Sequence, residues 1–396
     1  MSLQLPPLAL YIHVPWCIRK CPYCDFNSHQ ANNDIPEADY VAALRFDLLQ
    51  DQALAQGRKL TSIFFGGGTP SMLSAQAIGQ ILQDAENIIG FEPDIEITLE
   101  ANPGTFEQEK FSGFRAAGVN RLSIGIQSFN DQQLKLLGRV HGRAEALRAV
   151  GVARDAGFDN INLDLMHGLP EQSVEAARAD LQQAIELAPE HLSWYQLTIE
   201  QNTAFYSAPP VLPEEEILAD IQDAGIELLA AAGYEQYEIS AYARAKNRAR
   251  HNLNYWEFGD YLGIGAGAHG KITFPDENKI LRLWKTRLPK HYLDATTSQK
   301  ISTNLGGHQN VFGGGSDLLL PAALPLEFMM NALRLNTGVP VNYFTERTGV
   351  DWQQLDPQWQ TLATKGLVNR NSSYLSTTTL GFRFLNQVLS SFAHKK

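Results

Sequence analysis

The chain has 396 residues, of which 44% are hydrophobic, and it carries a formal net charge of −11 at pH 7. This length can bury a sizeable core and suits one large domain with a smaller one, whereas the acidic balance argues against general binding of nucleic acid or of an anionic membrane. No apolar run reaches the roughly 20 residues that span a bilayer, and the chain opens without a secretory leader, so we expect a cytoplasmic protein with reduced thiols.

The first predicted strand, Leu8–Val14, runs into a cluster of cysteines. All three cysteines of the chain lie within eight positions, at Cys17, Cys21 and Cys24. This number and spacing do not suit a disulfide framework and indicate a metal site instead.

The loop that carries these cysteines suits an iron–sulfur cluster. Pro15 and Pro22 disfavour a helix through it. Three thiolates on an open loop can wrap one cluster and leave one iron without a protein ligand. A structural zinc site with His13 or His29 as its fourth ligand is the alternative.

Short runs rich in β-forming residues recur roughly every thirty to forty positions in the first 245 residues. After Leu8–Val14 they are Ser62–Phe65, Ile95–Glu100, Arg121–Gln127, Asn160–Met166, His191–Ile199 and Tyr234–Ser240. Helical character lies between them. In Pro213–Ala232, for example, a proline and three glutamates favour a helix start, and Gly233 favours its end. Strands that alternate with helices predict βα units and a parallel sheet.

Glycine-rich and polar motifs stand at or just past the carboxyl ends of these strands. They are Gly66–Pro70, Glu100–Pro103, Gln127–Phe129 and the run from Asp164 to Pro170. Periodicity alone does not separate an open sheet from a barrel, but in a barrel these ends converge on one face, where such folds place their sites. We therefore predict an α/β fold with a partial, TIM-like (β/α) barrel, and the cysteine loop should open onto the same face.

The triple glycine Gly66–Gly68 is followed by Thr69 and Pro70. It lacks the Lys-Ser/Thr of a phosphate loop and does not match G-x-G-x-x-G. Residues without Cβ let the backbone come close to a ligand. A bare tight turn is the alternative.

After about Ser316 the chain is a small, α-rich unit. Its predicted helices are Leu326–Leu335, Val341–Gly349 and Gln358–Lys365, followed by a β-wing over 366–376 and a final helix, Thr379–Phe392. Charges here are few and mixed, without the basic stripe of a DNA-binding helix.

Several motifs together resemble the coproporphyrinogen III oxidase-like family of radical S-adenosylmethionine (SAM) proteins. They are Tyr11–Cys17, Cys21–Asn27, Phe65–Pro70, Arg121–Phe129, Asp164–Pro170 and His251–Trp256, so the resemblance extends over nearly the whole chain. It implies a radical SAM barrel over 1–245, an extension over 246–315 and a winged-helix-like domain over 316–396. We interpret the last as a lid or a haem-delivery surface, with Gly306–Gly315 as its hinge.

The resemblance also assigns roles to residues. Cys17, Cys21 and Cys24 would hold a [4Fe-4S] cluster. SAM would be bound by Tyr11, Tyr23, Gly68, Thr69, Glu100, Gln127, Arg139, Asp164, Thr198 and His269. Asp164 or Glu100 can accept hydrogen bonds from ribose hydroxyls, and Arg139 can pair with a carboxylate; each could instead be half of a salt bridge.

One position separates two branches of the family. The oxygen-independent oxidase carries a fourth cysteine two positions after the third, where this chain has Phe26. The haem-chaperone branch lacks that cysteine and carries H-N-x-x-Y-W, which matches His251–Trp256. We therefore expect a haem chaperone that binds about one haem per chain and transfers it to apo-haemoproteins. The alternative is an oxygen-independent coproporphyrinogen III dehydrogenase, and we expect that this enzyme activity is absent.

The haem-binding candidates are His251, Asn252, Tyr255 and Trp256. An imidazole is a ready axial ligand of haem iron, and aromatic rings can stack on the macrocycle. The basic residues Arg244, Lys246, Arg248 and Arg250 precede them and could meet propionates. A solvated helix face, with His251 as a hydrogen-bonded core residue, is the alternative. An electron donor such as a flavodoxin or ferredoxin, and a possible homodimer, complete the expected partners.

Overall fold

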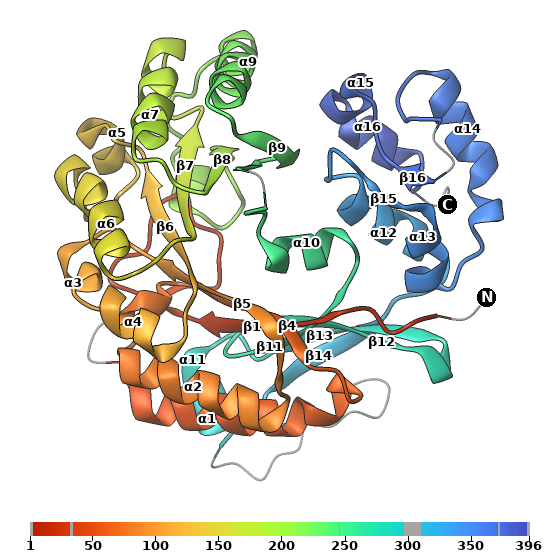
Figure 1. Cartoon of the computed structure of the whole chain (residues 1–396), viewed down its shortest axis with the longest axis horizontal. Coiled ribbons are helices and arrows are strands. Elements are labelled where there is room, and N and C mark those ends of the chain that lie inside the picture. Colours follow the sequence, from red (N-terminus) through yellow and green to blue (C-terminus); the bar gives the residue numbers. More distant parts are fainter. Residues whose placement is uncertain (1–2, 32–34, 245, 297–309, 371–372, 394–396) are drawn as a thin grey trace.

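The computed structural model describes residues 3–31, 35–244, 246–296, 310–370 and 373–393. Its centre is one open sheet of twelve strands with the order β14-β13-β12-β11-β1-β4-β5-β6-β7-β8-β10-β9 (Figure 1). Seven neighbouring strands are parallel, namely β1 (Leu8–Val14), β4 (Leu60–Gly67), β5 (Phe91–Ala101), β6 (Arg121–Gln127), β7 (Ile161–His167), β8 (His191–Gln196) and β11 (Asp260–Ile264). The predicted α/β fold with a partial barrel is confirmed.

Most residues of the parallel strands are buried, because helices cover the outer face of the sheet, although Glu92, Pro93 and Asp94 near the start of β5 are exposed. In β1, six of seven residues are buried. The covering helices are α1 (Glu37–Asp51), α2 (Ala75–Ile88), α4 (Phe111–Ala117), α6 (Arg143–Asp155), α7 (Val174–Glu186) and α9 (Glu215–Ala231), and the shorter α3 (Thr105–Gln108), α5 (Asp131–Leu136), α8 (Ala204–Ser207) and α11 (Pro289–Asp294) lie between strands. The predicted helix Pro213–Ala232 is confirmed as α9, and Gly233 follows it with a positive φ of 81°.

Both ends of the sheet are antiparallel. The predicted strand Tyr234–Ser240 exists as the shorter β9 (Glu235–Glu238), but it pairs with β10 (Ala241–Ala243), which runs antiparallel to β8. The expectation of a further parallel βα unit here was wrong, because a tight turn reverses the chain. At the other end, β12 (His269–Phe274), β13 (Lys279–Lys285) and β14 (Gly313–Leu318) form an antiparallel meander beside β11.

The meander corrects the predicted hinge. Gly313–Gly315 lie in strand β14 and pair with β13, so they belong to the sheet. The boundary between 315 and 316 therefore falls inside a strand. Residues 306–309 of the predicted hinge lie outside the described residues.

The C-terminal unit has its own apolar core. It contains α12 (Leu324–Ala332), α13 (Val341–Thr348), α14 (Asp356–Thr364), and strands β15 (Val339–Pro340) and β16 (Tyr374–Leu375), which pair with each other. The predicted final helix is two short helices, α15 (Thr379–Arg383) and α16 (Leu385–Ser390), because Phe384 leaves the helical conformation with ψ 36°. This core also includes Tyr237 and Phe258 of the barrel side.

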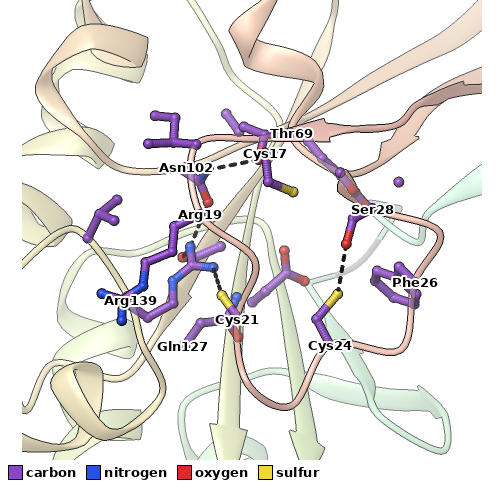
Figure 2. A pocket seen from close by; sticks show the side chains of 18 of the residues that line it. Cys17, Arg19, Cys21, Cys24, Phe26, Ser28, Thr69, Asn102, Gln127 and Arg139 are labelled. Carbon is purple, nitrogen blue, oxygen red and sulfur yellow. Dashed lines mark hydrogen bonds between the residues drawn. The ribbon is translucent and has the colours of Figure 1, made fainter. Parts of the chain in front are cut away.

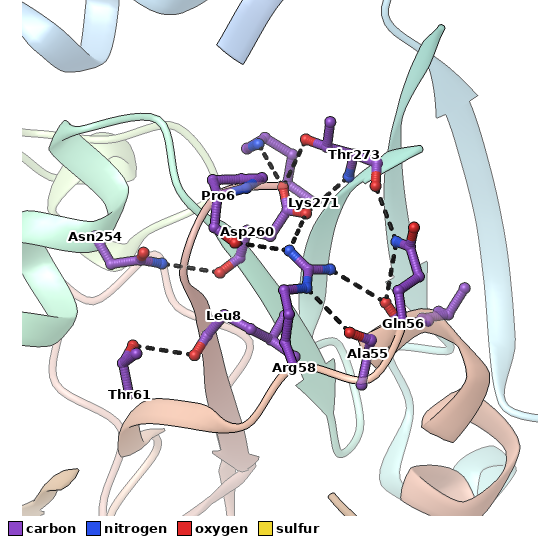
Figure 3. Close-up of polar contacts among 11 residues, drawn as sticks. Pro6, Leu8, Ala55, Gln56, Arg58, Thr61, Asn254, Asp260, Lys271 and Thr273 are labelled. Carbon is purple, nitrogen blue, oxygen red and sulfur yellow. Dashed lines mark hydrogen bonds and ion pairs between the residues drawn. The ribbon is translucent and has the colours of Figure 1, made fainter. Parts of the chain in front are cut away.

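A buried ion cluster fastens the amino-terminal edge of the parallel strands (Figure 3). The Asp260 carboxylate accepts hydrogen bonds from Arg58 at 2.8 Å, from Lys271 at 2.9 Å and from the Thr273 hydroxyl at 2.8 Å. Burial alone would raise the pKa of Asp260, but the charges of Lys271 and Arg58 hold it below its usual value. This edge lies opposite the carboxyl ends of the strands. The ion cluster therefore stabilises the fold, and the carboxyl ends of the strands remain available for a functional site.

Candidate functional site

The cysteine loop leaves β1 as an irregular turn. Trp16 and Cys17 form the short strand β2 (Trp16–Cys17), which pairs in parallel with β3 (His29–Gln30). Between them, the Lys20 ammonium donates to the carbonyl oxygens of Phe26 at 3.3 Å and Ser28 at 3.2 Å. No helix passes through this loop, as the prolines predict.

The loop is also tied to the barrel. The Asn27 carbonyl accepts a hydrogen bond from His13 Nε2 at 2.8 Å, so His13 Nδ1 accepts from the Tyr11 hydroxyl at 3.0 Å. The Asn27 side-chain amide donates to the carbonyl oxygens of Ala266 at 2.9 Å and Arg287 at 2.8 Å. Strand β1 and the segments just after β11 and β13 therefore hold the cysteine loop in place.

The three thiols face one space, and each has a polar neighbour, which for Cys17 is the Thr69 side chain (Figure 2). Arg139 Nη1 donates to Cys21 Sγ at 3.6 Å, and Ser28 Oγ lies 3.6 Å from Cys24 Sγ. Burial raises the pKa of Cys17 and of Cys24. Metal binding must therefore displace protons from these thiols.

The cavity around these thiols, which we term the cysteine cavity, has a volume of about 280 Å³. Ten predicted site residues line it: Cys17, Cys21, Cys24, Tyr23, Gly68, Thr69, Glu100, Gln127, Arg139 and Asp164. They come from the loop, from the carboxyl ends of β4, β5 and β6, from the middle of β7, and from the segment after α5. The structure thus brings together residues that are up to 147 positions apart, from Cys17 to Asp164.

Gln127 and Arg139 are positioned by specific contacts. Gln127 ends β6 with a positive φ of 69°, a conformation that costs a non-glycine residue energy and is concentrated at functional sites. Its side-chain oxygen accepts from the Tyr195 hydroxyl at 2.7 Å. Arg139 Nη2 donates to the Asn102 side chain at 2.6 Å and to the Gly125 carbonyl at 2.9 Å. The guanidinium is therefore fixed at the wall beside Cys21.

Two carboxyl groups lie deep in the cysteine cavity. Burial, and then the charge of Asp164, raise the pKa of Glu100 to about 8. Asp164 accepts hydrogen bonds from Ser123 at 2.9 Å and from Asn162 at 2.9 Å. Neither carboxyl group forms an ion pair with another described residue, so both can meet a polar or cationic ligand.

Buried hydrogen bonds continue from Asp164 to the start of α10 (Arg250–Trp256). His191 Nδ1 donates to the Asn162 side-chain oxygen at 2.6 Å, so His191 Nε2 accepts from the Tyr237 hydroxyl at 2.9 Å. That hydroxyl accepts from the Ala249 amide at 3.3 Å. This chain of contacts connects the cysteine cavity with the helix that carries the H-N-x-x-Y-W segment.

Three predicted SAM residues lie elsewhere. Tyr11 and His269 line a second cavity, of about 820 Å³, which shares Phe26, Gly67 and Glu100 with the cysteine cavity. Thr198 is exposed after β8 and lines neither of these two cavities. The second cavity, which we term the aromatic cavity, is lined by Tyr11, His13, Phe26, Asn27, Gly67, Glu100, Tyr255, Tyr261, Gly267, His269, Trp284 and Arg287.

The H-N-x-x-Y-W segment forms α10, which packs on β4. His251 is only 1% exposed, and its two ring nitrogens lie 3.0 Å from the Ser62 hydroxyl and 2.9 Å from the Tyr255 hydroxyl. Burial, and then the charge of Arg121, lower the pKa of His251 to about 3, so its ring is neutral. As placed, His251 anchors the helix, and an iron–imidazole bond would require one of these two contacts to break.

The other candidates of this segment differ in position. Tyr255 lines the aromatic cavity, whereas Trp256 does not. The Arg334 guanidinium lies 4.3 Å from the centre of the Trp256 ring. Asn252 is partly buried and lines neither the cysteine nor the aromatic cavity. Of the preceding basic residues, Arg248 pairs with Glu235 at 3.6 Å, and Arg244 lies over the Tyr234 ring.

Several residues of the two cavities were missed by the sequence reasoning. Asn102 stands in the strand-end motif Glu100–Pro103, so that motif could have identified it. Asn27 ends the motif Cys21–Asn27, which could have identified it, whereas Tyr261 in β11, Trp284 in β13 and Arg287 just after β13 belong to no motif of the sequence analysis.

The donor set fits an iron–sulfur cluster with an open iron. Three thiols face one cavity, and a Cβ on Gly68 would lie 2.5 Å from the Trp16 carbonyl oxygen, so only glycine allows this close approach beside the loop. In the described part of the chain, no three His, Cys, Asp or Glu side chains converge as a single metal ion needs. Of the two candidate fourth ligands of the alternative zinc site, His13 has both ring nitrogens in hydrogen bonds, and His29 does not line the cysteine cavity.

Two family models match the chain. The radical SAM superfamily model matches residues 11–184, and the HemN C-terminal domain model matches residues 319–384. A separate finding concerns membranes: none of the described helices has the length and hydrophobicity of a membrane span.

The similar full-length relatives are haem chaperones. The chain is 49% identical to the heme chaperone HemW of Escherichia coli, over 98% of this chain and 99% of the relative. It is 50% identical to HemW of Haemophilus influenzae, over 98% of both chains, and 33% identical to HemW of Bacillus subtilis, over 97% and 98%. The solved coproporphyrinogen III oxidase HemN of Escherichia coli shares the fold, with a TM-score of 0.79 at 23% identity over 98% of this chain and 90% of that one. The chain therefore belongs to the HemW family of HemN-like radical SAM proteins.

Proposed function

We propose that the chain is a haem chaperone, which binds about one haem per chain beside a [4Fe-4S] cluster and SAM and transfers it to apo-haemoproteins. Membership of the radical SAM superfamily implies the cluster and SAM. The observation that carries the haem proposal is the pairing of the two cavities. The cysteine cavity and the aromatic cavity lie side by side and share Phe26, Gly67 and Glu100.

Residues of the cysteine cavity suit the cofactors. Cys17, Cys21 and Cys24 would bind three irons. When bound, the cluster would supply one-electron chemistry, and SAM would fill its open coordination position. Glu100 would meet the cationic part of SAM as a carboxylate, and the Arg139 guanidinium, held at the wall, would face the carboxylate of SAM.

The aromatic cavity suits a large planar ligand. Its volume of about 820 Å³ lies within the range of about 300–1,000 Å³ for sites of large organic ligands. Tyr11, Tyr255, Tyr261 and Trp284 offer ring faces and edges, which pack well against an aromatic macrocycle. Tyr255 belongs to α10, so the H-N-x-x-Y-W segment would contribute a wall of the haem site, with His251 as its anchor.

The second candidate function is oxygen-independent coproporphyrinogen III dehydrogenase. It is favoured by the same pair of cavities, because a porphyrinogen would sit where a radical formed at the cluster could reach it. Phe26 argues against it. Its side chain is 59% exposed and borders both cavities at the position of the fourth cysteine of that enzyme.

The proposed partners follow from the same site. The acceptors are apo-haemoproteins, and the electron donor for the cluster is a flavodoxin or a ferredoxin, which would approach the exposed side of the cysteine loop. A homodimer and a cytoplasmic location are further parts of this proposal. The three unpaired cysteines suit a reducing compartment.

An anaerobic haem titration of the cluster-containing protein tests the proposal. Soret absorbance should saturate at about one haem per chain, with or without added SAM. The same preparation should form no protoporphyrinogen from coproporphyrinogen III when SAM and a strong reductant are supplied. If haem does not bind saturably and the porphyrinogen is converted, the enzyme is the correct function and the chaperone is refuted.

A further inference from the structure

The aromatic cavity is lined by one imidazole that forms no hydrogen bond with a described residue. Three histidines lie in or near this cavity. His13 has both nitrogens in hydrogen bonds, to Tyr11 and Asn27, and His251 has both nitrogens in contact with hydroxyl groups. The His269 ring lines the cavity, is exposed, and forms no hydrogen bond with any described residue.

His269 is presented by rigid backbone. It begins β12 and pairs directly with Trp284 of β13, whose ring centre lies 6.4 Å from the imidazole. On the inner side, Gly263 of β11 lies so close that a Cβ there would be 1.9 Å from the His269 carbonyl oxygen. Three strands therefore fix the backbone that carries this imidazole, as a site on rigid elements requires.

The protonation state of His269 suits metal binding. Burial, followed by the positive charges of Arg282 and Arg287, lowers its pKa. The ring is therefore neutral at pH 7, and neutral imidazole is the form that binds iron.

A positive charge stands in the same cavity. Arg287 is the only lysine or arginine among the residues that line it. Its side chain is exposed and forms no ion pair with a described residue. A guanidinium in this position can bind a carboxylate with two parallel hydrogen bonds, as haem propionates would require.

We propose that His269, and not His251, supplies the axial imidazole to haem iron in the aromatic cavity, with Arg287 opposite a propionate. This assignment deepens the proposed function and rests on it. It also changes the role of His269, which the resemblance had assigned to SAM.

Spectroscopy of ferric haem bound to the full-length, cluster-containing protein tests the assignment. In His269→Ala we expect loss of the imidazole-ligated Soret and electron paramagnetic resonance signature, with at least about tenfold weaker haem binding. Added free imidazole should restore the signature by filling the vacated position. His269→Met should give a thioether-type spectrum, and this second variant excludes a simple folding failure. His251→Gln should keep the imidazole signature.

Three results can be told apart. If wild-type protein binds no haem, the proposed function itself fails. If wild-type protein binds haem and His269→Ala and His269→Met both keep its spectrum, the chaperone stands and the ligand assignment is refuted. Loss of the signature in His251→Gln, with both His269 variants unchanged, would return the ligand role to His251.

Discussion

Replacing Gly68 by alanine should damage both the fold and the cluster site, because this glycine packs directly on the backbone that leads into Cys17. The added Cβ would lie 2.5 Å from the Trp16 carbonyl oxygen and 2.9 Å from the Pro15 carbonyl carbon. These are backbone atoms, which cannot rotate away. Two hydrogen bonds, from Gly68 N to Val14 O and from Thr69 N to Trp16 O, both 2.7 Å long, hold the two segments together.

The expected cost is that of overpacking, about 1–3 kcal/mol of the free energy of unfolding. Displacement of Trp16 would also move Cys17, so the iron and sulfide content per chain should fall. Gly151→Ala is the matched control. Gly151 is exposed in α6, a Cβ there would meet nothing within 4 Å, and alanine should stabilise the helix by about 0.5–1 kcal/mol.

Thermal or urea denaturation of both variants, with iron and sulfide assays after anaerobic purification, measures these effects. The two variants should shift the unfolding transition in opposite directions. A Gly68→Ala protein with wild-type stability and a full iron content would refute the argument that the glycine loop and the cysteine loop depend on each other through this contact.

Three further predictions concern the iron–sulfur ligand Cys21, the buried carboxyl group of Glu100 and the ion cluster around Asp260. Cys21→Ser should remove the iron–sulfur absorbance and leave the far-ultraviolet circular dichroism unchanged, because the loop adds little to the core; a full cluster in this variant would contradict the ligand set. Because the pKa of Glu100 is raised to about 8, the fraction of Glu100 in its carboxylate form increases with pH. Between about pH 6 and pH 7.5, the SAM affinity measured by calorimetry should therefore rise about 20-fold more in wild type than in Glu100→Gln. An equal dependence of SAM affinity on pH in both proteins would refute a contact between Glu100 and SAM. Asp260→Asn should lower the free energy of unfolding by about 3–5 kcal/mol, because it leaves Lys271 buried without a countercharge. Asp223→Asn, which breaks an exposed ion pair with Arg383, should lower it by at most about 1 kcal/mol. Equal unfolding midpoints of the two variants would contradict this account.

Much of the parallel part of the fold was predictable from the sequence, because strands buried on both faces give unmistakable apolar runs. The bounds of β1 and β6 match the predicted Leu8–Val14 and Arg121–Gln127. The position of polar residues after such runs also predicted the cysteine cavity, since the carboxyl ends of parallel strands share one edge. Glu100 and Asp164, which begin two of the strand-end motifs, line the cysteine cavity.

The aromatic cavity was less predictable, because it depends on the antiparallel meander. Which side chains of β12 and β13 face inward is decided by register, and a shift of one residue would turn Trp284 to the opposite face. The same applies to the buried bonds from His191 to Asn162 and Tyr237, which join residues 29 and 46 positions apart. No local pattern in the sequence reports such contacts.

The most direct test of the central claim is haem transfer. The full-length protein, with its cluster and one bound haem, is mixed under anaerobic conditions with an apo-haemoprotein such as apomyoglobin, and the two proteins are then separated and their spectra recorded. We expect the rate of haem transfer to the acceptor to exceed the rate at which the chain loses haem to a haem-binding agent of similar affinity. Transfer at the same rate with both would show passive release and would contradict a chaperone.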